Sequence, residues 1–206
     1  MRSSRVLGSV LLPLLLVISC AAEDLGHRNS TLQALALCHE QPLKTLAPGL
    51  LAQQEIVRLL VNDGVSGLHV ITIHFNKDEV VLKHCRVGFA LRSVNDLHAS
   101  PTHAEIKTTR KFSGMQAFNL RELWKGMSFF KLPQSIPQRG SPQDGPEIII
   151  EATKLNNYWM IDRSFILDMR IEATSSFRET NVKSFIIYAC GLADADLLLF
   201  QKYVGP

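Results

Sequence analysis

The sequence predicts a mainly β domain in which an antiparallel meander is closed by a helix near the C-terminus. The first observation is that residues 147–190 form a series of apolar runs separated by short polar breaks. The second is the period of two within one run, where Phe165, Leu167, Met169 and Ile171 alternate with mostly polar residues. This alternation is typical of a half-buried antiparallel strand, and the breaks are short enough to be hairpin loops. Together with strands expected upstream, it predicts about eight strands and one or two helices.

The N-terminus is a targeting signal rather than part of the fold. Arg2 and Arg5 precede the apolar residues 11–18, and the small residues Ser19 and Ala21 fit cleavage after Ala21. The apolar run is too short to span a bilayer, and no second run is long enough to anchor the chain. We therefore expect a signal peptide over residues 1–21 and a single secreted, extracellular domain over residues 22–206.

The charge balance excludes one class of partner. Removal of residues 1–21 leaves 20 lysines and arginines against 19 aspartates and glutamates. A nearly neutral chain lacks the electrostatic footprint of a protein that binds nucleic acid or an anionic membrane. We therefore expect no nucleic-acid partner. The lack of a second long apolar run predicts no integral membrane segment. We also take the protein to be a monomer.

The middle of the chain supplies further strands. Residues 50–61 predict either a short amphipathic helix or a buried strand that begins near Ile56, and periodicity does not decide between them. Residues 68–75 alternate as a strand, residues 76–78 form a turn, and residues 79–91 are the return strand. Residues 105–111 are typical of a polar strand.

The remaining segments are less regular. Residues 118–132 carry four aromatic residues and predict a strand pair around Lys125-Gly126. Residues 133–146 hold four prolines and two glycines and should form an irregular loop. The C-terminal helix is expected to begin near Ala193, because Leu197, Phe200 and Val204 share one helical face.

If the chain is secreted, its cysteines can form a disulfide and one sequon can be glycosylated. Cys20 leaves with the signal peptide, so Cys38, Cys85 and Cys190 remain for one disulfide and one further thiol. The sequence leaves all three pairings open. We favour Cys38 with Cys190, because an N-terminal segment is poorly ordered unless it is anchored to the rest of the domain. Asn29-Ser30-Thr31 is an N-glycosylation sequon, which predicts a glycan on Asn29.

The C-terminal third resembles the lipocalins, and among them the secreted orosomucoid and apolipoprotein M type. Residues 183–189 (Lys-Ser-Phe-Ile-Ile-Tyr-Ala) look like the last barrel strand of that family, and residues 191–202 look like its following turn and helix. The family usually opens its first strand with Gly-x-Trp, whereas no tryptophan precedes Trp124 here. The resemblance implies an antiparallel β-barrel of about eight strands with a C-terminal α-helix packed on it.

A barrel of this size either holds one small ligand or is filled by its own side chains. If it is hollow, the resemblance implies a secreted carrier that sequesters a small hydrophobic ligand such as a lipid, with Tyr158 or Arg163 orienting it at the mouth. The alternative is a secreted β-sandwich or open-sheet module that binds another protein and has no small-molecule pocket. The inward-facing candidates for ligand binding are Phe89, Trp159, Ile161, Phe165, Leu167, Met169, Phe185 and Ile187.

No pattern supports catalysis, a cofactor or a metal. If Phe75 pairs with Glu79, His69 faces Cys85, which suggests a nucleophile pair or half a metal site, but more simply a histidine beside a disulfide or buried thiol. In that register His74 and His84 lie on the opposite face. Four-ligand metal spacing, a nucleophile elbow and a phosphate-binding glycine loop are all missing from the sequence.

One basic cluster stands out, formed by Lys107, Arg110 and Lys111. We expect it on an exposed strand or barrel rim, where charge protects the edge from unwanted pairing. The other interpretation is that it grips the acidic head group of a ligand.

Overall fold

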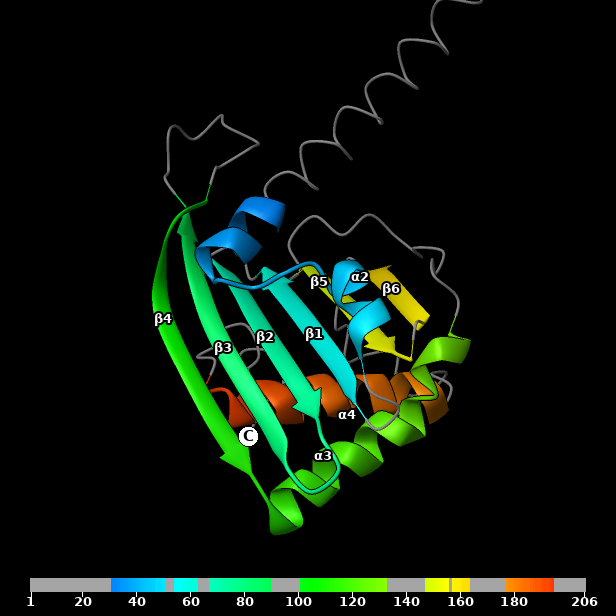
Figure 1. Ribbon diagram of the computed structural model, residues 1–206. Coiled ribbons are helices and arrows are strands. Elements are labelled where there is room, and N and C mark those ends of the chain that lie inside the picture. Colours follow the sequence, from blue (N-terminus) through cyan, green and yellow to red (C-terminus); the bar gives the residue numbers. More distant parts are fainter. Residues whose placement is uncertain are drawn as a thin grey trace, which may run out of the picture.

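The central feature of the protein is an antiparallel sheet, seen here in a computed structural model that describes residues 31–50, 54–62, 67–89, 101–132, 147–155, 157–163 and 177–194. Within these residues the sheet has six strands in the order β4-β3-β2-β1-β5-β6 (Figure 1). Every neighbouring pair is antiparallel. The strands are β1 (Glu55–Asn62), β2 (Leu68–Phe75), β3 (Val80–Phe89), β4 (Pro101–Phe112), β5 (Glu147–Lys154) and β6 (Asn157–Arg163).

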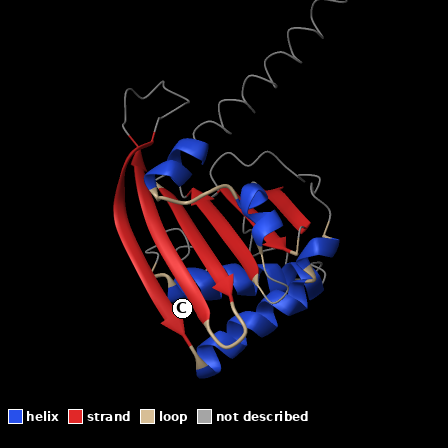
Figure 2. Cartoon of the chain, in the orientation of Figure 1, coloured by secondary structure: helices blue, strands red, loops and turns tan. Residues whose placement is uncertain are grey.

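Two long helices cover one face of the sheet, which we call the inner face (Figure 2). They are α3 (Gly114–Met127) and α4 (Phe177–Leu192), and they also pack against each other. Val57 and Leu59 of β1 share their core with Trp124 of α3 and Phe185 of α4. The aromatic centre is compact, since the Trp124 ring lies 5.0 Å from that of Phe129 and 5.3 Å from that of Phe185.

Shorter segments cover part of the opposite, outer face. Residues 31–37 are helical and pack Ala34 and Leu35 against Val70 and Val87. The chain then crosses the sheet and continues into α2 (Leu43–Leu46) and the 3-10 turn η1 (Ala47–Gly49), so the N-terminal segment lies over β5 as well (Figure 1). Both faces of β1 are consequently buried, which explains why its residues 56–61 are all apolar except for Arg58.

The two predicted hairpins are confirmed. β2 pairs with β3, and β5 pairs with β6, at nearly the expected positions. Residues 50–61 contain a strand rather than a helix, which agrees with the second of the two interpretations. The polar strand expected at residues 105–111 is the centre of β4.

Two predicted strand regions are helical, and both predictions were wrong. Residues 118–132 lie mostly in α3, whose buried residues Ala117, Leu120, Trp124 and Met127 recur every three to four positions. Residues 183–189, matched to a last barrel strand, lie inside α4. Because α4 contacts both the sheet and α3, it is apolar on several sides, and such a run cannot be distinguished from a buried strand by periodicity.

The predicted barrel is not observed. Among the described residues the sheet is open, with β4 and β6 at its two edges. The chain is thus a mainly antiparallel sheet with helices packed on it. A helix was expected to begin near Ala193. Ala193 and Asp194 instead form a turn after α4, and residues 195–206 lie outside the described part of the chain.

Candidate functional site

The hairpin register decides which polar side chains meet. Phe75 pairs with Val80 rather than with Glu79, because the loop has four residues and is closed by a hydrogen bond from the Asn76 N–H to the Glu79 carbonyl. A shift of one residue moves side chains to the other face of a strand. The predicted neighbours His69 and Cys85 therefore lie on opposite faces, and His69 instead meets His84.

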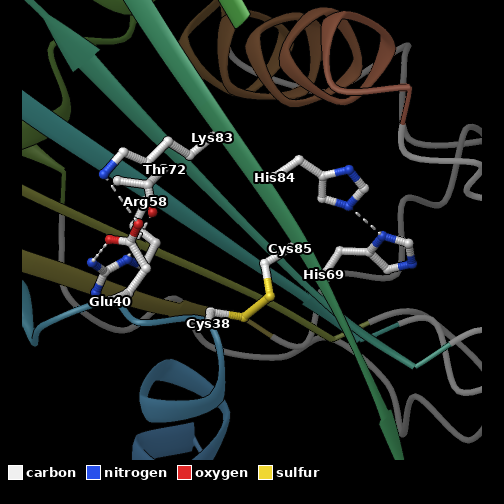
Figure 3. Close-up of a disulfide and its surroundings, with 8 residues drawn as sticks. All are labelled: Cys38, Glu40, Arg58, His69, Thr72, Lys83, His84 and Cys85. Atoms are coloured by element: carbon white, nitrogen blue, oxygen red, sulfur yellow. Dashed lines mark hydrogen bonds and ion pairs between the residues drawn. A yellow bond between two sulfur atoms is a disulfide. The ribbon is translucent and has the colours of Figure 1, made fainter. Parts of the chain in front are cut away.

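The two histidines form a buried pair on the inner face (Figure 3). Nδ1 of His69 lies 3.1 Å from Nε2 of His84, and the rings are nearly parallel with centroids 5.3 Å apart. Nδ1 of His84 lies 3.1 Å from the carbonyl oxygen of Ala193, just beyond α4. That oxygen can only accept, so Nδ1 of His84 carries a proton, and in the neutral ring Nε2 accepts from His69. The pair links β2, β3 and the end of α4.

Both burial and charge keep His84 neutral. Burial, together with nearby His69, Arg86 and Arg110, lowers the pKa of His84 from 6.5 to about 4, although the hydrogen bond to the Ala193 carbonyl acts in the opposite direction. Arg86 is paired with Glu105, and Arg110 is paired with Asp194. Among the described residues, both arginines near His84 thus have a carboxylate partner of their own.

We expect the free energy of unfolding to fall as the pH drops from about 6.5 towards 4. The unfolded chain takes up a proton at His84 near pH 6.5, whereas the folded chain resists it until about pH 4, so acid favours unfolding. The full difference corresponds to about 3 kcal/mol. Denaturant titrations across this window should show a shallower pH dependence for His84→Gln than for the native protein. The slope should not vanish, because burial also lowers the pKa of His74. An identical slope in both proteins would contradict the assignment.

A second buried polar group, centred on Arg58 of β1, lies on the outer face (Figure 3). Its Nη1 donates to the carboxylate of Glu151 at 2.8 Å, and its Nε donates to Thr72 at 3.2 Å. Its Nη2 donates to the carboxylate of Glu40 at 3.0 Å and to the Gln41 carbonyl at 2.9 Å. We call Arg58 and these four partners the Arg58 cluster. Its acceptors come from β2, β5 and the N-terminal segment, so it fastens that segment to the sheet.

Glu151 of the Arg58 cluster has a second hydrogen-bond partner. The Tyr158 hydroxyl donates to the second oxygen of Glu151 at 2.9 Å, and burial together with that carboxylate raises the pKa of Tyr158. Tyr158 thus binds a carboxylate of the Arg58 cluster, whereas the sequence placed it at the mouth of a barrel. The acceptors of Arg58 come from three separate segments of the chain, so the geometry indicates a structural anchor.

The disulfide joins Cys38 to Cys85, which are 47 positions apart in the sequence, so the favoured pairing of Cys38 with Cys190 is wrong. Cys85 lies on the outer face of β3 beside the N-terminal segment, whereas Cys190 lies on α4 on the inner face, with the sheet between it and Cys38. The N-terminal segment is therefore tied down as expected, but to a different partner. Cys190 is a free, buried thiol whose pKa is raised to about 12 by burial.

The predicted ligand-binding residues are divided between the sheet–helix core and segments outside the described residues. Ile161 of β6 and Phe185 of α4 are buried in the sheet–helix core, and Trp159 packs against it while donating to the Leu132 carbonyl at 3.1 Å. Ile187 is half-buried on α4. Phe89 ends β3, but its side chain lies outside the described part, as does that of Arg163. Phe165, Leu167, Met169 and the sequon residue Asn29 also lie outside the described residues.

The predicted basic cluster separates into two groups. Arg110 points to the inner face, where it donates to the Leu192 carbonyl at 3.3 Å and pairs with Asp194. Lys107 and Lys111 are exposed on the other side of β4. β4 is an edge strand within the described residues, as the sequence predicted, and this leaves the lysines beside an open row of main-chain groups.

Comparison with known proteins gives no relative, since neither the family models nor the curated proteins include one that matches this chain. The lipocalin resemblance stays a prediction. Among the described residues, no helix is both long and apolar enough to cross a membrane. The same residues contain no group of three or more histidine, cysteine, aspartate or glutamate side chains placed to hold a metal ion.

Proposed function

We propose that this chain is a secreted module that binds another protein by adding an extended segment of its partner to the edge strand β4. The observation that carries the proposal is that the sheet is open and that the twelve-residue β4, which has an exposed surface, is an edge strand among the described residues. An unpaired edge offers main-chain donors and acceptors to a partner strand, which is a recurring mode of peptide recognition. The Cys38–Cys85 disulfide is compatible with export.

The character of the inner face favours this function over small-molecule carriage. A carrier needs a hollow behind its sheet, whereas here α3 and α4 occupy the apolar side with Trp124, Phe129 and Phe185. The apolar residues of β1 and β5 that would line a calyx are packed against those helices. Native mass spectrometry of the secreted protein distinguishes the two functions, since a carrier should retain a lipid-sized mass and a strand-binding module should not.

The edge also carries features that limit binding to the wrong partner. Lysines on an edge strand oppose pairing with a second copy of the same strand, because like charges would face each other. The β3–β4 register shifts between Arg86 and Val87 and again between Gly88 and Phe89, so the first part of β4 is irregular. The regular part of the edge is therefore residues 106–112, which is long enough for several main-chain hydrogen bonds.

Photo-crosslinking followed by amide exchange tests the proposal. A photoreactive residue at Thr109, exposed on β4, should capture a partner from extracellular fluid, whereas the same residue at Gln116, exposed on α3, should not. With the captured partner purified, amides of residues 106–112 should gain at least tenfold protection from exchange on binding. Unchanged exchange in β4, with protection elsewhere, would show that the partner docks on another surface.

A further inference from the structure

The open part of the outer face carries three lysines that act as one group. Lys107 pairs in register with Cys85, Thr109 with Lys83, and Lys111 with Val81. Because side chains on the same face recur every two residues, Lys107 and Lys111 flank Lys83 diagonally, at about 7–8 Å between Cα atoms. We call Lys83, Lys107 and Lys111 the edge lysines. They surround Thr109, which is exposed between them.

The edge lysines are only weakly neutralised by the protein itself. Lys107 makes no ion pair with any described residue, and Lys111 lies 3.6 Å from Glu79 with both side chains largely exposed. Lys83 lies 3.7 Å from Glu40, but that carboxylate already accepts a hydrogen bond from Arg58 at 3.0 Å. The positive field extends to the neighbouring strand, because Lys83 helps burial to lower the pKa of His74. This surface has spare positive charge for a partner.

From this placement we infer that the segment bound along β4 is acidic, with carboxylates four residues apart. The inference rests on the proposed strand addition. In a segment paired with β4, the residues opposite Lys107, Thr109 and Lys111 recur at every second position on the outer face. The two outer residues then lie beside lysines, and the middle residue lies beside the Thr109 hydroxyl. An extended Glu-x-Thr-x-Glu pattern satisfies all three positions.

A peptide is favoured over an anionic polysaccharide because of where the lysines lie. They flank a strand edge whose main chain is unpaired within the described residues, and only a polypeptide can complete its hydrogen bonds. A sulfated polysaccharide would use the lysine charges alone and would leave the amides of β4 exposed to exchange.

The test uses a fluorescent peptide Thr-Glu-Val-Thr-Val-Glu-Thr and its twin with both glutamates replaced by glutamine. In low salt, Lys107→Gln and Lys111→Gln should each weaken binding of the acidic peptide about two- to fivefold, and the triple variant with Lys83→Gln should weaken it at least tenfold. Lys125→Gln, which removes an exposed lysine on α3, is the matched control and should leave binding unchanged. The glutamine twin should bind the native protein no better than the acidic peptide binds the triple variant.

The outcomes separate this inference from the proposed function. If both peptides protect residues 106–112 from exchange equally, strand addition stands and the acidic preference is overturned. If heparin binds through the edge lysines without protecting β4 and neither peptide binds, the acidic segment is replaced by a polysaccharide ligand. If the partner captured at Thr109 fails to protect β4, the proposed function fails, whatever the peptides do.

Discussion

Replacement of Arg58 by alanine should lower the free energy of unfolding by about 3–5 kcal/mol. Among the described residues, the substitution removes the one cation paired with Glu151 and leaves Glu40 only its more distant pairing with Lys83, while both carboxylates remain largely buried. Breaking a buried ion pair from one side costs this much because it leaves uncompensated charge away from water. Thr72 and the Gln41 carbonyl lose a hydrogen-bond donor as well. Denaturant unfolding followed by circular dichroism measures the loss.

A charge-neutral background separates this electrostatic cause from simple loss of packing. In a protein that already carries Glu40→Gln and Glu151→Gln, removal of Arg58 should cost less, because no buried carboxylate is left unpaired. Lys125→Ala, at an exposed ion pair on α3, is the surface control and should change stability by less than about 1 kcal/mol. A loss below about 1 kcal/mol for Arg58→Ala itself would show that the Arg58 cluster does not anchor the fold.

Removal of the disulfide by Cys38→Ala together with Cys85→Ala should cost about 4 kcal/mol, the loop-closure value for a bridge of this span. Alanine is preferred to serine because both sulfur positions are buried and a hydroxyl would need a partner there. The loss should be concentrated in residues 31–37, whose docking on the outer face depends on this bond and on Ala34 and Leu35. Unfolding with and without reductant provides the measurement.

The reductant experiment also tests which cysteines are paired. The native protein should lose stability on reduction, and the Cys38/Cys85 variant should be insensitive to reductant. Cys190→Ala should remain as sensitive as the native protein, since Cys190 is a free thiol. If Cys190→Ala abolished the effect of reductant instead, the pairing would be the one that the sequence favoured.

Local signals in the sequence predicted the strands of the two hairpins and the centre of β4, left β1 undecided and were insufficient for two helices. The runs around Ile71 and Ile150 are short and are bounded by turn residues, so their hairpins could be predicted. Phe185 sits in an apolar segment that contacts both the sheet and α3, and there helix and strand patterns coincide, whereas the helical spacing of the buried residues around Trp124 was a signal that was missed. The barrel prediction followed from that error. With residues 183–189 interpreted as a strand, the prediction lacked the helix α4, which covers the inner face of the sheet.

The site could be predicted only in part, because it depends on register and on distant partners. A difference of one residue in the loop after Phe75 separates His69 from Cys85 and brings it to His84. The isolated charge of Arg58 within an apolar strand was a visible signal, but its partner Glu151 lies 93 residues away. An apolar inward-facing residue such as Ile161 has the same sequence pattern whether it lines a cavity or fills a core.

The pairing of β1 with β5 has a consequence for how the chain folds as it is synthesised. β1 to β4 form a local meander, but Val57 to Val61 complete their pairing only with residues 148–152, after α3 and the following segment have been made. During that interval the growing chain presents an apolar strand with one open side, a kind of surface that promotes aggregation. The open side of β1 is covered only when β5 pairs with it. We therefore expect this long-range pairing, and not the formation of either hairpin, to limit the rate of folding.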